Sequence, residues 1–539
     1  MSWLKQWEPE NPQFWKDQGS GLAWRTMWIT TFTLIFSFAT WFVMSAVAVR
    51  LPAIGFQFDQ MQLFWLAAMP GLSGGTFRII HAFIIPIFGT RLTITVATFL
   101  KIIPMVWLGF AILDPATPYW QFMIISILCG FGGGDFSSYM PSTSLFFPKR
   151  LQGVSLGIQA GIGNFGVSLT QFVTPWIIMF PLIAALGSPQ IFTKPGNIEI
   201  KKENAIVKQI NIKDPAWKKL IEVKDDGKGN ITDVVKKDNS EDAKKLQLVV
   251  KKNEAGNVTD VRVGANMWLQ NSAFWYIPVL IFAGLICLIW LRSVPVKASI
   301  KEQLDIFGKK NRAGRHTLYC TITYVMTFGS FAGFSAAFPL MIKAIYGNIP
   351  GIVGPDPLKY SFLGPLVGAV IRALTGPIFD KIGGSIGIMI SGVGMILGCA
   401  ALLFGGYLTP INLDPFNGFV GIMLWIFLMS GIGNAATFRQ YPIVFAYSPR
   451  QGAGVVGWTA AIAAYGPFIF SSLIGGSIAT FKTGSIRGAM PFFIGVAIYY
   501  VIATLINWFV YTKPGAERGD WGNKWGTWWD KAKSTWPTN

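Results

Sequence analysis

Apolar stretches long enough to cross a lipid bilayer recur along most of the chain, with polar connectors between them. A helix needs roughly 20 predominantly apolar residues to span the hydrocarbon. Twelve stretches come near or exceed this length: 26–49, 61–84, 87–111, 119–146, 154–186, 272–291, 317–341, 361–379, 385–407, 418–445, 454–480 and 489–511. The pattern predicts an all-α membrane protein with twelve transmembrane helices.

Composition agrees with this prediction, because 52% of the residues are hydrophobic and only 13% are charged. Soluble domains carry about 25% charged residues. The four cysteines all fall within predicted spans, and their spacing is not typical of a zinc site or a disulfide framework. We therefore expect no metal and no other cofactor.

The net charge of +19 is concentrated in alternate connectors, which argues against a nucleic-acid partner. Lysine and arginine gather in one set of connectors, at Arg91, 149–150, 292–315, 380–381 and Arg450. The intervening connectors carry aspartate and little positive charge. Because cytoplasmic loops are enriched in lysine and arginine, both termini, 1–25 and 512–539, are expected in the cytoplasm.

A charged segment, 188–268, interrupts the apolar pattern and is expected on the extracytoplasmic side. Residues 229–234, Gly-Asn-Ile-Thr-Asp-Val, recur 27 positions later as Gly-Asn-Val-Thr-Asp-Val at 256–261. β-branched runs on both sides of a Gly-Asn turn predict a β-hairpin, so two hairpins are expected in a small antiparallel sheet. Either the segment is a binding module or protein contact, or it is a tolerated insertion.

A second repeat divides the chain into two halves. Glycine-rich segments and prolines of the fourth and tenth spans share one offset, since Gly130 corresponds to Gly431 and Pro141 to Pro442. Related groups of six spans are typical of transporters whose substrate site lies between the halves. The first half comprises 26–187 and a sixth helix at 269–292. A cytoplasmic linker at 293–316 leads to the second half at 317–511.

Two arginines lie within apolar spans, one in each half. Arg78 and Arg372 are each far along the sequence from any other permanent charge. An arginine at the centre of a membrane helix costs roughly 2.5–3.5 kcal/mol on insertion scales, so it is expected to face a cavity with a function. Asp135 is the clearest acid at this depth and cannot neutralise both arginines. The planar guanidinium suits an oxyanion, and the pair predicts an anion clamp.

Other polar and aromatic residues are candidates for the same site. The amides of Asn164 and Asn434 need partners at membrane depth. Phe136, Tyr324 and Phe328 supply aromatic faces, and the last two share one helix face because they are four residues apart.

The sequence resembles the nitrate/nitrite porters of the major facilitator superfamily over nearly its whole length outside 188–268. The resemblance is carried by these motifs: Gly130–Gly134, Phe146–Lys149, Gly157–Gly166, Trp7–Pro12, Gly75–Arg78, Thr327–Phe331, Gly364–Pro365 and Asp380–Gly384. It implies that two arginines hold the planar anion, that two aromatic rings sandwich it, and that a tyrosine and an asparagine contact it. By motif these residues are Arg78, Arg372, Phe136, Phe328, Tyr324 and Asn164.

Two positions depart from the family pattern. Asp135 stands where an asparagine is usual, and His81 stands where an aromatic residue is common. His81 is either a carrier of a coupling proton or a neutral residue that makes one hydrogen bond. Arg439 is another charge within a span. Because Asp135 and Arg439 occupy equivalent helices of the two halves, we predict that they form an ion pair that helps to hold a closed state.

The sequence and the resemblance therefore predict a monomeric transporter of nitrate and nitrite in a bacterial inner membrane. We expect it to be surrounded by membrane lipid and to work by alternating access. Exchange of the two anions is the leading hypothesis, because an empty clamp closes poorly. Proton-coupled nitrate symport is the first alternative, and a nitrate sensor that signals through 188–268 is the second. We do not expect an enzyme, because the sequence has no metal cluster, nucleophile triad or phosphate-binding loop.

Overall fold

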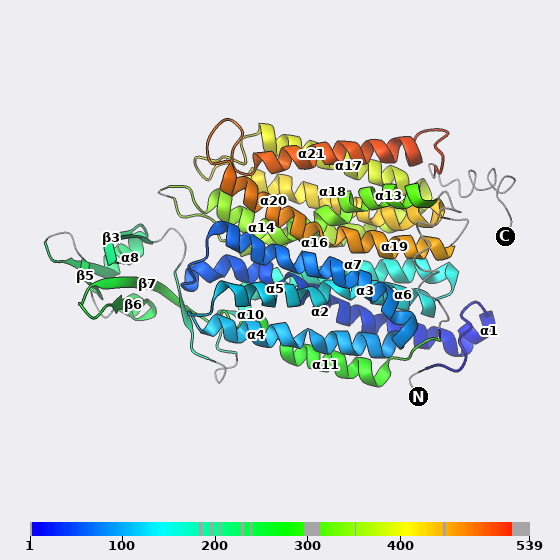
Figure 1. The fold of residues 1–539 in the computed structure, drawn as a ribbon, viewed down its shortest axis with the longest axis horizontal. Helices are drawn as coiled ribbons and strands as arrows, with labels where there is room; N and C mark the ends of the chain where they lie inside the picture. The colour runs from blue at the N-terminus through cyan, green and yellow to red at the C-terminus, as the bar shows by residue number, and fades with distance from the viewer. Residues whose placement is uncertain are drawn as a thin grey trace.

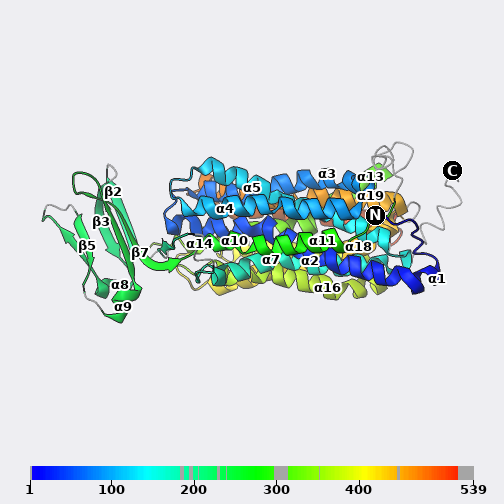
Figure 2. The same cartoon turned by 90° about the horizontal axis from the view of Figure 1, so that it is seen from below.

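Long helices run side by side along most of the structure, and a group of β-strands extends from one end of them (Figure 1; Figure 2). This computed structural model describes residues 3–182, 187–193, 198–203, 206–227, 231–237, 240–295, 313–350, 352–445 and 449–519. Large parts of the predicted linker 293–316 and tail 512–539 lie outside these residues. The short helix α1 (Pro12–Phe14) lies at the end of the bundle opposite the strands.

The first half is built from the N-terminal helices and from α10 and α11, which follow the insertion. Its helices are α2 (Ser20–Arg50), α3 (Gln60–Leu100), α4 (Ile102–Leu113), α5 (Tyr119–Gly134), α6 (Phe136–Phe146), α7 (Lys149–Ile177), α10 (Asn271–Phe274) and α11 (Tyr276–Trp290). A π-helical turn, η1 (Trp15–Gly19), precedes α2, and a 3₁₀ turn, η2 (Leu51–Ile54), follows it.

The second half contains the remaining helices. These are α13 (Ala313–Tyr324), α14 (Ser330–Tyr346), α15 (Leu358–Ser361), α16 (Leu363–Ile382), α17 (Gly384–Phe404), α18 (Phe416–Val444), α19 (Pro449–Ala463), α20 (Gly466–Thr480) and α21 (Met490–Asn507). Two further π-helical turns are η5 (Val325–Gly329) and η6 (Trp508–Thr512). The halves meet where α2 packs on α14, α3 on α19 and α20, and α7 on α16.

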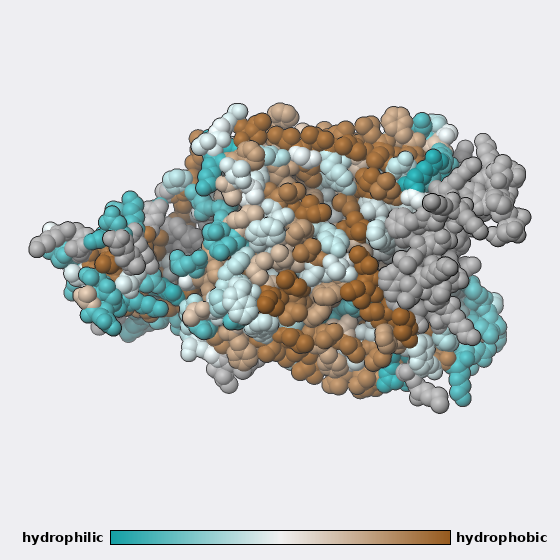
Figure 3. All heavy atoms as spheres, viewed as in Figure 1, coloured by the Kyte–Doolittle hydropathy of each residue, from teal (hydrophilic) through white to brown (hydrophobic). Residues whose placement is uncertain are grey.

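Ten helical segments among the described residues are long and apolar enough to cross a membrane. The predicted span 119–146 is helical but is divided at Asp135 into α5 and α6, of 16 and 11 residues, each too short to cross alone. The predicted span 154–186 is helical in α7 as far as Ile177, and glycine, serine, threonine and amide residues lower its apolarity. Apolar residues cover much of the helical body, whereas hydrophilic residues predominate over the strands (Figure 3). Leu374 and Phe404 are 66% and 89% exposed on this body, as expected of residues that face lipid.

The helix α3 breaks at Gly89, which lies inside the third predicted span, a few residues beyond the boundary predicted from the sequence. Gly89 interrupts α3 with φ 72° and ψ 168°, a conformation that L-residues with side chains rarely adopt. A Cβ atom at Gly89 would also lie 2.5 Å from the Ser293 Oγ and 2.8 Å from the ring of Trp3. Glycine therefore permits both the reversal of the chain and its close approach to the end of the sixth span.

The described residues of the insertion form three small antiparallel sheets, which confirms the β-rich prediction, but the two predicted hairpins lie in separate sheets and not in one. The repeated segments form two hairpins, β4 (Ile221–Asp225) with β5 (Ile231–Lys236), and β6 (Gln247–Lys252) with β7 (Val258–Met267). Sequence reasoning missed β1 (Gln190–Phe192), which pairs with the end of β7, and the hairpin of β2 (Ile198–Glu203) with β3 (Ile206–Ile212). Two short helices, α8 (Pro215–Leu220) and α9 (Glu241–Lys245), connect the strands.

Two hydrogen bonds to backbone carbonyls attach the insertion to the end of α2. The guanidinium Nη1 of Arg262 donates a hydrogen bond of 2.7 Å to the Ile54 carbonyl. The backbone N–H of Thr193 donates a hydrogen bond of 3.0 Å to the Ala53 carbonyl. Both acceptors belong to η2, so the strands stabilise the point where the first span leaves the bundle.

Candidate functional site

Arg78 lies on α3 in the first half and is completely buried. Its Nε donates a hydrogen bond of 2.7 Å to the carbonyl of Gly133, and its Nη1 donates one of 2.7 Å to the carbonyl of Ala460 in the second half. Its Nη2 is buried without a hydrogen-bond partner in the part of the chain that the structure describes. Two carbonyls therefore fix the plane of the guanidinium, and the nitrogen Nη2 is left for a ligand.

Aromatic rings surround the Arg78 guanidinium. Its central carbon lies 4.7 Å from the ring centroid of Phe136, 5.2 Å from that of Phe328 and 5.2 Å from that of Trp41. These distances are typical of cation–π contacts. Gly133 permits this arrangement, because a Cβ atom there would lie 2.5 Å from the Trp41 ring.

Arg372 lies on α16 in the second half and is 5% exposed. Its guanidinium carbon lies 4.9 Å from the ring centroid of Phe438. Both terminal nitrogens, Nη1 and Nη2, are buried and have no hydrogen-bond partner among the described residues. A buried donor without a partner costs about 1–3 kcal/mol, and more when it is charged. Arg372 therefore has a stronger need for a ligand than Arg78 has.

Three aromatic rings form a stack beside the arginines. The rings of Phe136 and Phe328 lie 6.4 Å apart between centroids and are inclined by 21°, and the rings of Phe328 and Tyr324 lie 5.5 Å apart at 13°. Phe328 lies within the π-helical turn η5, and such turns are frequent at functional sites. A flat ligand between two rings needs about 7 Å, twice the contact distance of roughly 3.5 Å, so Phe136 and Phe328 are close to the separation required.

Side-chain contacts join most of the predicted site residues into one cluster. Phe438 connects its two sides, because its ring lies 6.2 Å from that of Tyr324 and close to Arg372. Sequence reasoning missed Phe438, which immediately precedes the candidate Arg439, and Trp41, which is far from every candidate in the sequence. These contacts do not extend to Asn164 and Asn434 within the described parts of the chain. Both amides are nevertheless buried, and neither their oxygens nor their nitrogens have hydrogen-bond partners there.

The predicted ion pair between Asp135 and Arg439 is wrong. The Asp135 carboxylate accepts a hydrogen bond from the Lys101 ammonium and one of 2.8 Å from the Ser37 hydroxyl. The side chains of Lys101 and Asp135 are each 1% exposed. Lys101 lies between α3 and α4, and both helices pack against α5. The ammonium group is therefore close to the Asp135 carboxylate at the end of α5. A search for every cation within an apolar span would have found Lys101.

The remaining two candidates lie in other surroundings. The Nδ1 of His81 is 2.7 Å from the hydroxyl oxygen of Ser138, a contact that a neutral or a protonated imidazole can make. Arg439 is half-buried on α18. The coupling or gating roles of both residues stay predictions.

No family model matches the chain. A probable nitrate/nitrite antiporter of Thermus thermophilus, NarK2, is 45% identical over 519 residues, which cover 96% of this chain and 98% of that protein. The nitrate/nitrite transporter NarU of Salmonella typhimurium is 32% identical over 94% of this chain and 96% of its own length. The chain belongs to the nitrate/nitrite porter family of the major facilitator superfamily. A solved structure of a D-xylose–proton symporter matches this porter with a TM-score of 0.54 at 13% identity, over 90% of this chain and 97% of that one. The structural match supports the twelve-helix fold.

Replacement of Lys101 tests the buried ion pair of this porter. Lys101→Met leaves the Asp135 carboxylate without its cation, and the loss of one partner of a buried pair costs about 3–5 kcal/mol. We expect Lys101→Met to lower the unfolding temperature in detergent, and Lys101→Met/Asp135→Asn to recover most of the loss because neither charge then remains. Asp135→Asn alone is the matched control. A double variant no more stable than Lys101→Met would contradict the assigned pair.

Proposed function

We propose that the protein exchanges nitrate for nitrite across the membrane by alternating access. The observation that carries the proposal is the excess of positive charge at the centre of the bundle. Arg78 and Arg372 come from opposite halves, and Asp135, the acid predicted at this depth, is engaged by Lys101. Three of the four terminal nitrogens of the two arginines have no hydrogen-bond partner among the described residues. A bound monoanion supplies acceptors for these donors and neutralises one of the two charges.

The shape of the site favours a small, flat oxyanion. Phe136 and Phe328 present nearly parallel faces, and their separation admits one planar layer after a displacement of less than about 1 Å. Guanidinium groups match the spacing of two oxygens in a planar oxyanion. Nitrate and nitrite combine a flat shape with a single negative charge, and the relatives are named for both anions.

Exchange follows from the electrostatics of an empty site. Two guanidiniums repel each other more strongly in the interior of a protein than in water. When the anion leaves, this repulsion opposes the approach of the two halves. The empty protein therefore changes slowly between the states that open to the two sides of the membrane. A second anion removes the barrier, which couples the departure of one anion to the entry of another. Because one chain supplies both arginines, a monomer is sufficient.

The orientation that we propose places both termini in the cytoplasm of a bacterial cell and the insertion outside the inner membrane. Basic residues predominate in the connectors on the side assigned to the cytoplasm. The strands lie at the opposite end of the bundle from α1 (Figure 1), as this orientation requires.

Lysine substitution tests the clamp. Arg78→Lys and Arg372→Lys each keep the charge and remove the planar fork of donors. A hydrogen bond to a charged group contributes roughly 1.5–3 kcal/mol, so we expect the affinity for nitrate to fall about 10- to 100-fold. Nitrate exchange by purified variants in liposomes measures this loss. Arg91→Lys, at the end of the bundle, is the matched control and should exchange normally. Normal exchange by both clamp variants would refute the site.

Flux measurements test the mode of transport. Liposomes that contain the protein are loaded with nitrite, with chloride, or with buffer under a pH gradient, and initial nitrate uptake is recorded. We expect rapid uptake only with internal nitrite, because the empty clamp returns slowly. Protein-free liposomes set the background. Uptake driven by the pH gradient without internal nitrite would instead establish proton symport.

Removal of strands β2–β6 separates a transporter from a sensor. Residues 198–252 would be replaced by a short Gly-Ser linker, which keeps β1 and β7 and their contacts with η2. We expect exchange close to that of the intact protein, because the clamp lies within the helical bundle. A folded variant without exchange would show that the insertion takes part in transport itself.

A further inference from the structure

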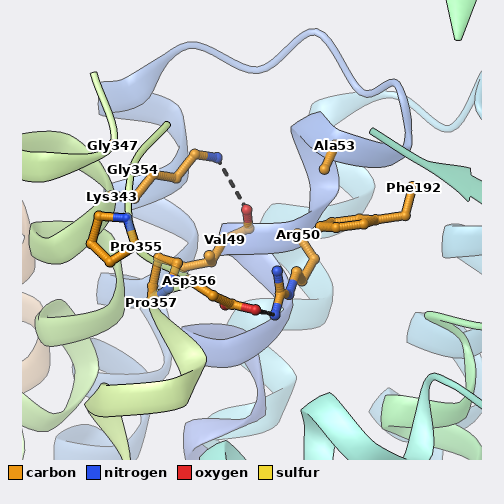
Figure 4. Close-up of a pocket in the computed structure, with 10 residues that line it drawn as sticks. All are labelled: Val49, Arg50, Ala53, Phe192, Lys343, Gly347, Gly354, Pro355, Asp356 and Pro357. Carbon is orange, nitrogen blue, oxygen red and sulfur yellow. Dashed lines mark hydrogen bonds and ion pairs between the residues drawn. The ribbon is translucent and has the colours of Figure 1, made fainter. Parts of the chain in front are cut away.

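A cavity of about 60 Å³ lies between the halves at the end of the bundle that carries the insertion (Figure 4). Arg50 of α2, Lys343 of α14 and Asp356 of the connector between α14 and α15 contribute its charged side chains, and Phe192 of the insertion lies beside Arg50. A water molecule occupies about 30 Å³ of liquid, so a group of a few atoms fits. The two cations and one carboxylate leave a net positive charge.

Arg50 holds Asp356 across the two halves. Its Nη2 donates hydrogen bonds of 2.8 and 2.9 Å to the two carboxylate oxygens, so a single nitrogen serves both. The side chain of Arg50 is 7% exposed, and its Nε is buried without a partner among the described residues. The guanidinium therefore has donor capacity that Asp356 does not use.

Lys343 closes the same boundary from the second half. Its ammonium donates a hydrogen bond of 3.0 Å to the carbonyl of Val49, the residue before Arg50 (Figure 4). Arg50 of the first half and Lys343 of the second half thus lie on opposite sides of this boundary, and the carboxylate of Asp356 binds Arg50. This arrangement parallels Arg78 and Arg372 at the centre, except that the oxyanionic group is a side chain.

The insertion fixes Arg50 in place. The ring of Phe192 in β1 lies 5.1 Å from the guanidinium carbon, and Thr193 and Arg262 hold the η2 turn that follows Arg50. An arginine held by an aromatic face and by the end of its own helix keeps its position when Asp356 moves away. It then faces the solution on the insertion side.

We propose that Arg50 is a second binding site for a small oxyanion, at which the transported anion competes with the carboxylate of Asp356. When the halves separate at this end, Asp356 moves with the second half and exposes Arg50 at the entrance. A cation in a narrow entrance raises the local concentration of anions. This inference rests on the proposed exchange function and on the proposed orientation, and it gives the insertion side an entry site distinct from the central clamp.

Two variants that differ only in the charge of residue 50 test the site. Asp356→Asn removes the competing carboxylate, and Arg50→Gln/Asp356→Asn removes the arginine as well. The KM for nitrate is measured from each side in right-side-out and inside-out vesicles. We expect the double variant to show a KM about three- to tenfold higher than Asp356→Asn on the insertion side and an equal KM on the other side. The difference should shrink at high ionic strength, where exposed charges are screened.

A third variant distinguishes this proposal from a purely structural role of Arg50, and a measurement on the unmodified protein distinguishes it from failure of the proposed function. Arg50→Lys/Asp356→Asn keeps the charge and should have a KM close to that of Asp356→Asn. Equal KM values for the two test variants on the insertion side, or an equal change on both sides, would overturn the entry site. Exchange by the unmodified protein is recorded in the same vesicles, and its absence would overturn the proposed function instead.

Discussion

The fold depends on the balance of charge in an interior where water does not reach. A buried ion is tolerated when a partner of opposite charge or several hydrogen bonds replace its hydration. Lys101 and Asp135 satisfy this requirement within the first half, and Arg50 and Asp356 satisfy it between the halves. Arg78 is partly satisfied by two carbonyls, whereas the terminal nitrogens of Arg372 have no partner among the described residues. In the proposed function, an external anion balances the remaining positive charge.

In the proposed site, the aromatic residues favour a flat anion. Rings cannot neutralise a guanidinium, but they exclude water and restrict the space to one flat layer. The helix geometry supports their placement, because η5 widens one turn around Phe328 and α5 gives way to α6 at Asp135, immediately before Phe136. The ion pair of Asp135 with Lys101 therefore also anchors one face of the aromatic stack. A departure from the usual asparagine is thus compensated by a cation on a neighbouring helix.

Much of this organisation follows from patterns that are local in the sequence. Apolar length predicts the spans, the 27-residue repeat predicts two hairpins, and isolated charge predicts Arg78 and Arg372. Contacts between remote residues carry no such signal, since Arg50 and Asp356 are 306 positions apart and Lys101 and Asp135 are 34 apart. The error over Arg439 has this origin, because pseudosymmetry relates positions in two helices without showing which cation is nearer. Strand β1 is too short to be recognised without its partner β7.

The proposed central clamp and the proposed entrance site differ in the source of their oxyanion. At the entrance the oxyanion is tethered, so its effective concentration at Arg50 is high and independent of the substrate. At the centre the oxyanion is supplied from solution, so the approach of Arg78 to Arg372 depends on substrate being present. A barrier that closes without substrate limits leakage, whereas a clamp that closes only with substrate enforces exchange. Placing the tethered carboxylate at the entrance and none at the centre therefore gives one chain both properties.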